Sequence, residues 1–102
     1  MTHDFYRGDI GKTLNIDTES TMTSLTTGSL YIVRADGSEV TWSVSTHASE
    51  VTYLTLTFGT STETNYLAST DAPGDWEGNA FVILGAASSI QMYGSTFIIN
   101  IG

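Results

Sequence analysis

The stretch Leu67–Leu84, LASTDAPGDWEGNAFVIL, decides the fold of this 102-residue chain. Its first half turns at Asp-Ala-Pro-Gly, and its second half alternates between two faces with period two, as a β-strand does. The face that opens with the large ring of Trp76 continues through Gly78, Ala80, Val82 and Leu84. The stretch therefore predicts a turn followed by a long strand that buries one face in a hydrophobic core.

Shorter alternating runs surround this strand on both sides. They cover residues 12–17, 25–34, 40–44, 51–58 and 97–101. Before them, residues 4–11 predict an edge strand or a bent arm. The segment Ala35–Ser38 contains Asp-Gly and predicts a hairpin, which places Trp42 on the return strand as a second core ring. Gly28 indicates a bulge. A phase slip between Tyr53 and Leu54 indicates a bulge or a strand that changes sheets.

About seven strands with turns every 8–12 residues are typical of a two-sheet sandwich. An aromatic residue at the start of a late strand, after a turn with Asp and Gly, is typical of immunoglobulin-like domains. We predict an all-β, immunoglobulin-like β-sandwich of about seven antiparallel strands in two sheets. Residues 1–102 form one domain of this kind.

The composition agrees with this class and excludes several partners. Seventeen Thr and twelve Ser residues suit strands with a hydroxylated surface. A net charge of −8 repels phosphate backbones and anionic lipids, so we expect neither nucleic acid nor a membrane as partner. No cysteine is present for disulfide or thiolate chemistry. The start of the sequence does not resemble a signal peptide, so we expect synthesis and folding in a cytoplasm.

No group of residues predicts catalysis or a cofactor. Oxygen ligands for Ca²⁺ could come from Asp71, Asp75, Glu77 and Asn79. Carboxylates at alternate strand positions converge poorly, however, so a solvated turn is the favoured interpretation and we predict no metal. The only histidines, His3 and His47, lack neighbours at ligand spacing and are interpreted as solvated. We expect a protein that is not an enzyme and needs no cofactor.

Sugar-binding sandwiches stack pyranose rings on exposed aromatic side chains. Tyr6, Tyr31, Tyr66 and Tyr93 are the candidates for exposure. Of these, Tyr66 and Tyr93 are the predicted contacts with a sugar or a partner. A carbohydrate-binding module is thus an alternative function.

Three segments carry a resemblance to a known group of proteins. They are DFYRGDIGKTLNIDT from Asp4, LYIVRADGSEVTW from Leu30, and DAPGDWEGNAFV from Asp71, the last followed by MYGSTFIINI from Met92. Together they resemble small immunoglobulin-like domains of tailed bacteriophages, and are similar to the N-terminal domain of siphophage upper-baseplate proteins. The likeness spans Phe5 to Ile101, and Ala35 stands where that group often has proline.

The resemblance implies a structural or adaptor subunit of the virion, associated with the tail or baseplate. Its partners would be other virion proteins in a homo-oligomer or hetero-assembly, and a stand-alone adaptor or decoration subunit fits the length. The first strand, Phe5 to Ile10, or the last, Phe97 to Ile101, would pair with a neighbouring subunit. The expected assembly residues are Phe5, Tyr6, Ile10, Phe97 and Ile99.

Overall fold

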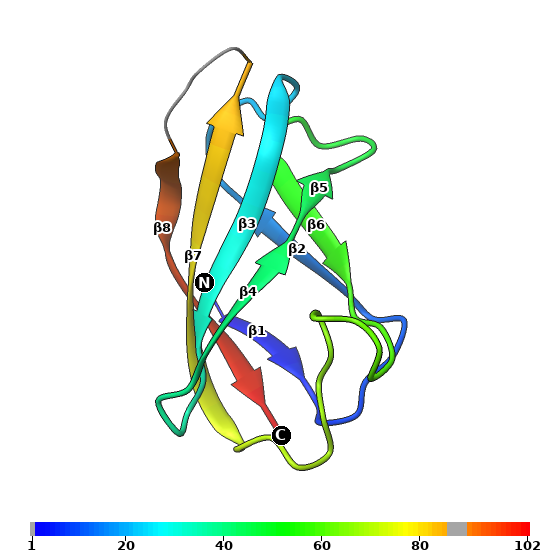
Figure 1. Cartoon of the computed structure of the whole chain (residues 1–102). Coiled ribbons are helices and arrows are strands. Elements are labelled where there is room, and N and C mark those ends of the chain that lie inside the picture. Colours follow the sequence, from blue (N-terminus) through cyan, green and yellow to red (C-terminus); the bar gives the residue numbers. More distant parts are fainter. Residues whose placement is uncertain (1, 86–89) are drawn as a thin grey trace.

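The computed structural model describes residues 2–85 and 90–102, apart from the side chains of Thr2, Met92, Tyr93 and Ser95. In this part every regular element is a strand, which confirms the all-β class (Figure 1). The eight strands are β1 (Thr2–Phe5), β2 (Thr13–Asp17), β3 (Leu25–Val33), β4 (Glu39–Ser43), β5 (Ser45–Thr46), β6 (Tyr53–Thr57), β7 (Gly74–Leu84) and β8 (Gln91–Ile101).

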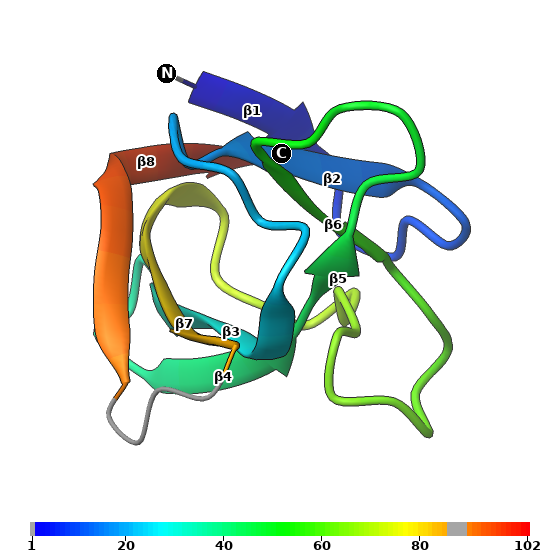
Figure 2. The same cartoon turned by 90° about the horizontal axis from the view of Figure 1, so that it is seen from above.

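The strands form two sheets, an arrangement compatible with a β-sandwich. The larger sheet has the order β1-β8-β7-β3-β4, and the smaller one has the order β2-β6-β5. Figure 2 shows the two sheets around a common interior. The prediction of antiparallel strands throughout is wrong in one place, because β1 pairs with β8 in parallel, with Thr2 beside Ile98 and Phe5 beside Ile101.

β7, the long strand predicted after the Asp-Ala-Pro-Gly turn, is the centre of the larger sheet. β7 pairs with β3 on one side and with β8 on the other. The buried residues of its inner face are Trp76, Gly78, Ala80 and Val82, whereas Leu84 at the end is half-buried. In β3, Leu30 and Ile32 are buried and Tyr31 and Val33 are half-buried. The buried face predicted for β7 is therefore confirmed, and β3 alternates in the same way.

The predicted hairpin joins β3 to β4. Arg34 N–H donates to the Ser38 carbonyl (2.8 Å), and Gly37 lies at a φ of +87°, a conformation that glycine adopts at no steric cost. The Asp36 carboxylate accepts hydrogen bonds from the hydroxyl (2.6 Å) and the N–H (2.9 Å) of Ser38. These bonds favour the charged carboxylate and lower the pKa of Asp36 below its usual value.

The chain changes sheets at Val44 rather than at the predicted slip in residues 51–58. Val44 N–H still donates to the Gly28 carbonyl of β3 (3.1 Å), and the next residue, Ser45, already pairs with Thr55 of β6. The β2–β6 ladder runs without irregularity. The bulge expected at Gly28 lies slightly earlier, between Leu25 and Thr27. Gly28 instead leaves room for Val44, whose Cγ2 would be 2.9 Å from an added Cβ.

The core lies between the sheets and contains both tryptophans, as predicted. Trp42 and Trp76 are 0% exposed, and their ring centroids are 6.4 Å apart. Phe58 meets Trp42 edge to face at 5.2 Å. The loop Thr18–Thr23 also reaches the core, although most of its residues are polar, since Met22 is fully buried.

Candidate functional site

The structure separates the five expected assembly residues into two groups. Phe5, Phe97 and Ile99 are buried in the core, and Phe5 stacks edge to face on Phe58 at 4.9 Å. Their side chains are thus interior contacts, so any pairing of these residues with a partner would use the backbone of their strands. Tyr6 and Ile10 are 69% and 61% exposed.

The last strand is not the sheet edge that the sequence suggested. Residues 98–101 of β8 pair with β1 on one side and with β7 on the other. β1 therefore covers this part of β8. The strands at the four sheet edges are β1 and β4 in the larger sheet and β2 and β5 in the smaller one.

The segment between β1 and β2, Tyr6–Gly11, forms an arm that the body of the protein holds by its backbone. Gly8 N–H donates to the Leu67 carbonyl (2.7 Å), and Gly11 N–H donates to the Phe58 carbonyl (2.8 Å). The exposed Tyr6 and Ile10 lie on this arm. Residues 4–11, for which the sequence predicts an edge strand or a bent arm, are therefore the end of a short strand at Phe5 and then an arm.

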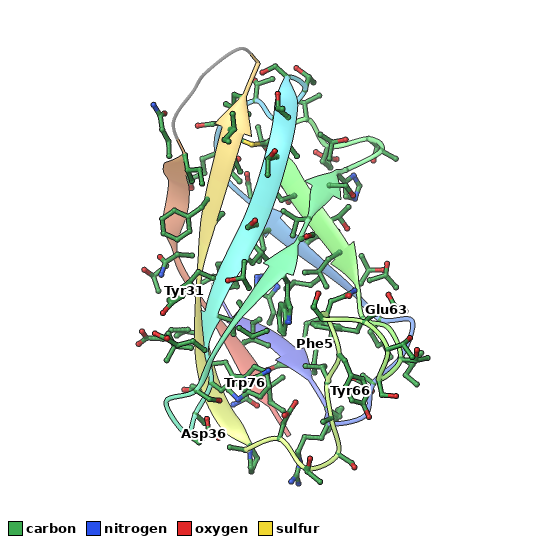
Figure 3. The ribbon with its side chains drawn as sticks, viewed as in Figure 1. Phe5, Tyr31, Asp36, Glu63, Tyr66 and Trp76 are labelled. Carbon is green, nitrogen blue, oxygen red and sulfur yellow. The ribbon has the colours of Figure 1, made fainter. Side chains whose placement is uncertain are left out.

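Tyr66 lies close to this arm, because the next residue, Leu67, accepts the hydrogen bond from Gly8. Figure 3 shows Tyr66 at the same end of the molecule as Phe5. Tyr66 is half-buried. The side chain of Tyr93 lies outside the described part of the structure.

The arm also ends the free edge of β1 at Tyr6. Gly102 N–H donates to the Phe5 carbonyl (2.9 Å) and Arg7 N–H donates to the Gly102 oxygen (3.0 Å), so Phe5 and Arg7 face β8. Tyr6, between them, faces away. Its N–H donates to the Asp9 carboxylate (2.9 Å) and its carbonyl accepts the Asp9 N–H (3.1 Å). A partner strand could not continue past this turn.

Within residues 2–85 and 90–102, no such turn bonds to the free edge of β4. Arg34 N–H bonds to Ser38 at one end of the β3–β4 ladder and Val44 N–H bonds to Gly28 at the other. Hydrogen-bonded pairs of an antiparallel ladder alternate with pairs whose backbone groups point away. The residues whose N–H and C=O groups point to the free edge are therefore Glu39, Thr41 and Ser43.

The outer end of this edge carries a polar contact. The Tyr31 hydroxyl on β3 donates to the Glu39 carboxylate on β4. This hydrogen bond to the carboxylate raises the pKa of Tyr31 above its usual value. Tyr31, a candidate for sugar stacking, is thus hydrogen-bonded to the neighbouring strand of its own sheet.

Three of the four residues considered as Ca²⁺ ligands each contact a different neighbour. The Asp71 carboxylate accepts the Ala68 N–H (2.8 Å), and the Asp75 carboxylate accepts from the Asn100 side chain (2.9 Å). The Asn79 side chain accepts from Thr96 (2.8 Å). Within the described residues no group of three or more His, Cys, Asp or Glu side chains could hold a metal ion.

The histidines differ from each other. His47 lies in a loop, where its Nδ1 accepts the N–H groups of Ser49 and Glu50 (both 3.1 Å). His3 lies in β1, half-buried with its ring edge on Phe97 at 6.1 Å, not in a mobile terminus. Burial lowers the pKa of His3 below its usual value.

Residues 2–85 and 90–102 contain no helix of the length and apolarity that crossing a membrane requires. No protein-family model matches the chain, and no curated protein or solved structure is significantly similar to it. The strand edges and the arm are the candidate functional surface. The edges can form backbone hydrogen bonds with a partner, and the arm can contact a partner through its exposed side chains.

Proposed function

We propose that this chain is a non-enzymatic structural or adaptor component of a bacteriophage virion, associated with the tail or baseplate, that acts through protein–protein assembly. The observation that carries the proposal is the composition of the sheet edges. None of the strands β1, β2, β4 and β5 contains Lys, Arg or Pro. Monomeric proteins commonly protect edges with such residues, whereas an edge that another chain covers needs no protection.

The strand order supports an immunoglobulin-like version of the fold as part of this proposal. The first strand pairs in parallel with the last, and β8, β7, β3 and β4 follow in one sheet while β2, β6 and β5 form the other. This partition fits the two-sheet Greek-key plan of immunoglobulin-like domains. The resemblance of the sequence to phage domains of that type supports the same assignment.

The test is whether the chain is a part of purified particles. Phage particles from a lysate of cells that carry this gene would be banded by density and analysed by mass spectrometry. Immunogold labelling with an antibody to the chain would then locate it on the particle. We expect the chain in the banded particles, with label at the tail. Its presence in the lysate and absence from the particles would contradict the proposal.

A carbohydrate-binding module for attachment to cell surfaces is the second candidate. Tyr6 is exposed on the arm. Tyr66 is half-buried and precedes Leu67, whose carbonyl accepts a hydrogen bond from the arm. Two accessible phenol rings at one end of a domain could stack on sugar rings. A glycan array of the wild-type chain and the variants Tyr66→Ala and Tyr93→Ala tests this function. Binding that the substitutions abolish would support it, and an array without any hit would exclude the glycans present.

A further inference from the structure

The β4 edge differs from the other three edges because it leaves both backbone groups and apolar side chains partly uncovered. β5 has only two residues, and the Asp9 turn ends the free edge of β1 at Tyr6. The inner row of β2 is fully buried, at Leu14 and Ile16. In β4 the inner row contains the half-buried Val40, and Val44 directly after the strand is also half-buried. A strand added at β4 would cover apolar surface in addition to satisfying backbone groups.

We propose that a second copy of this chain pairs with the β4 edge, antiparallel and about a two-fold axis at Thr41. This inference rests on the proposed assembly function and names one of its contacts. The backbone groups of Glu39, Thr41 and Ser43 point to the free edge, so each residue donates to and accepts from the second copy. The two larger sheets then form one continuous sheet across the dimer.

The two-fold register is compatible with the charges and side chains along the strand. With Thr41 opposite Thr41, Glu39 lies opposite Ser43 and the two Glu39 carboxylates lie at opposite ends of the contact. Threonine is a favourable partner for itself across antiparallel strands. On the inner face, Val40 of one copy lies opposite Trp42 of the other, where it loses exposure to water. Neither Lys, Arg nor Pro occurs on β4 to oppose the pairing.

The net charge gives the dimer a dependence on salt. Each copy carries a formal charge of −8, so two copies repel each other at long range. Salt screens this repulsion, with a Debye length of about 10 Å at 0.1 M. Association between copies should therefore strengthen as salt is added. Pairing of this edge with a basic partner would weaken instead.

The experiment uses charges at position 41 and a matched threonine as control. Thr41→Lys and Thr41→Glu each place like charges opposite one another across the proposed axis, which destabilises a strand pair. Thr13, at the β2 edge, is exposed as Thr41 is. Sedimentation equilibrium across a concentration series would be recorded for the wild type, Thr41→Lys, Thr41→Glu, Thr13→Lys and an equimolar mixture of the two Thr41 variants. Chemical denaturation would show that all variants are folded.

We expect the mass of the wild type to rise from 10.9 kDa toward twice that value with concentration, and the same for Thr13→Lys. The dissociation constants of Thr41→Lys and Thr41→Glu should each be raised by about tenfold or more, which corresponds to about 1.4 kcal/mol. The mixture should recover or exceed the wild-type affinity, because Lys then lies opposite Glu. Only a register that places residue 41 against itself predicts this recovery.

Three results would overturn the inference. They are a wild type that stays monomeric at every concentration, a dimer that Thr41→Lys leaves intact, and a dimer that Thr13→Lys disrupts. None of these results decides the proposed virion function, since a monomeric chain could still bind a different virion protein. That function is tested by the analysis of purified particles. Conversely, absence from particles would refute the virion role even if the dimer forms.

Discussion

Phe97 lies over Gly78, and its ring occupies the place that a Cβ atom on the glycine would take. The two residues are directly opposite each other on β8 and β7. Phe97 is 4% exposed, so its ring cannot swing out without leaving the core. Just beyond this pair the register of the two strands shifts. Gly78 is therefore a packing requirement in a strand where glycine would otherwise be unfavourable.

Gly78→Ala should destabilise the fold by about 1–3 kcal/mol, the usual cost of overfilling a packed core. The added methyl group would lie inside the contact distance of the Phe97 ring. Denaturation by urea measures the loss. A double variant with Phe97→Leu should lose less than the sum of the two single variants, since the smaller side chain makes room. Strict additivity would show that the ring does not limit the space at Gly78.

Gly37→Ala tests a glycine that is required by the backbone and not by space. Its φ is +87°, and nothing lies within 4 Å of an added Cβ. We expect a loss of about 1–2 kcal/mol from the left-handed conformation, and a smaller loss for Gly37→Asn, because asparagine tolerates that region. The two variants would be compared by urea denaturation. Equal stabilities of the two would contradict the conformational explanation.

Trp76→Phe should cost more stability than Trp42→Phe, although both rings are fully buried. Trp76 Nε1 donates to the Ala72 carbonyl (2.9 Å), whereas Trp42 Nε1 has no hydrogen-bond partner in the described part of the chain. Replacing Trp76 removes a made hydrogen bond, and replacing Trp42 removes an unsatisfied donor. The difference should be about 1 kcal/mol or more in the free energy of unfolding. The reverse order would mean that ring volume and shape decide the result.

His3 should make the stability fall in mildly acidic solution. Burial lowers its pKa in the folded protein below the usual 6.5, and Nε2 is buried without a partner among the described residues. The unfolded chain therefore binds the proton more readily. The contribution of neutral His3 is complete above pH 6.5 and is lost as the pH falls from there through the folded pKa. Nearby Asp4 opposes the shift in part.

Urea midpoints at several pH values would measure this loss in the wild type and in His3→Gln. We expect the decrease between about pH 7 and pH 5 to be smaller in the variant, which has no ring to protonate. Identical pH profiles would show that His3 is as accessible to protons in the folded protein as in the unfolded one.

The strands that could be predicted are those whose faces differ in polarity. Leu14 and Ile16 in β2, or Leu30 and Ile32 in β3, alternate with polar neighbours and indicate the buried side directly. β5 has two residues, Ser45 and Thr46, too few for any alternation. Its existence depends on Val44, where the chain leaves one sheet for the other, and this change of partner leaves no mark in the local pattern.

The candidate site could be predicted only in part, because polarity indicates a face and not a neighbour. The alternation of polar and apolar residues around Ile99 fits an edge strand and a central strand equally well. Only the pairing of Ile99 with His3 of β1, far away in the sequence, shows that the strand is not an edge there. Tyr6 and Ile10 were recognised as surface residues of the first segment. The β4 edge was not recognised, since a free edge is defined by the absence of a strand beside it in space.

The parallel pairing of β1 and β8 determines how the domain responds to mechanical force. Because both strands run the same way, Thr2 and Gly102 lie toward opposite ends of the shared ladder. Tension applied through these two ends pulls the strands along each other, so their hydrogen bonds carry the load together instead of opening one at a time. A chain linked at both ends to larger bodies would resist stretching far better than a hairpin pulled apart at its open end.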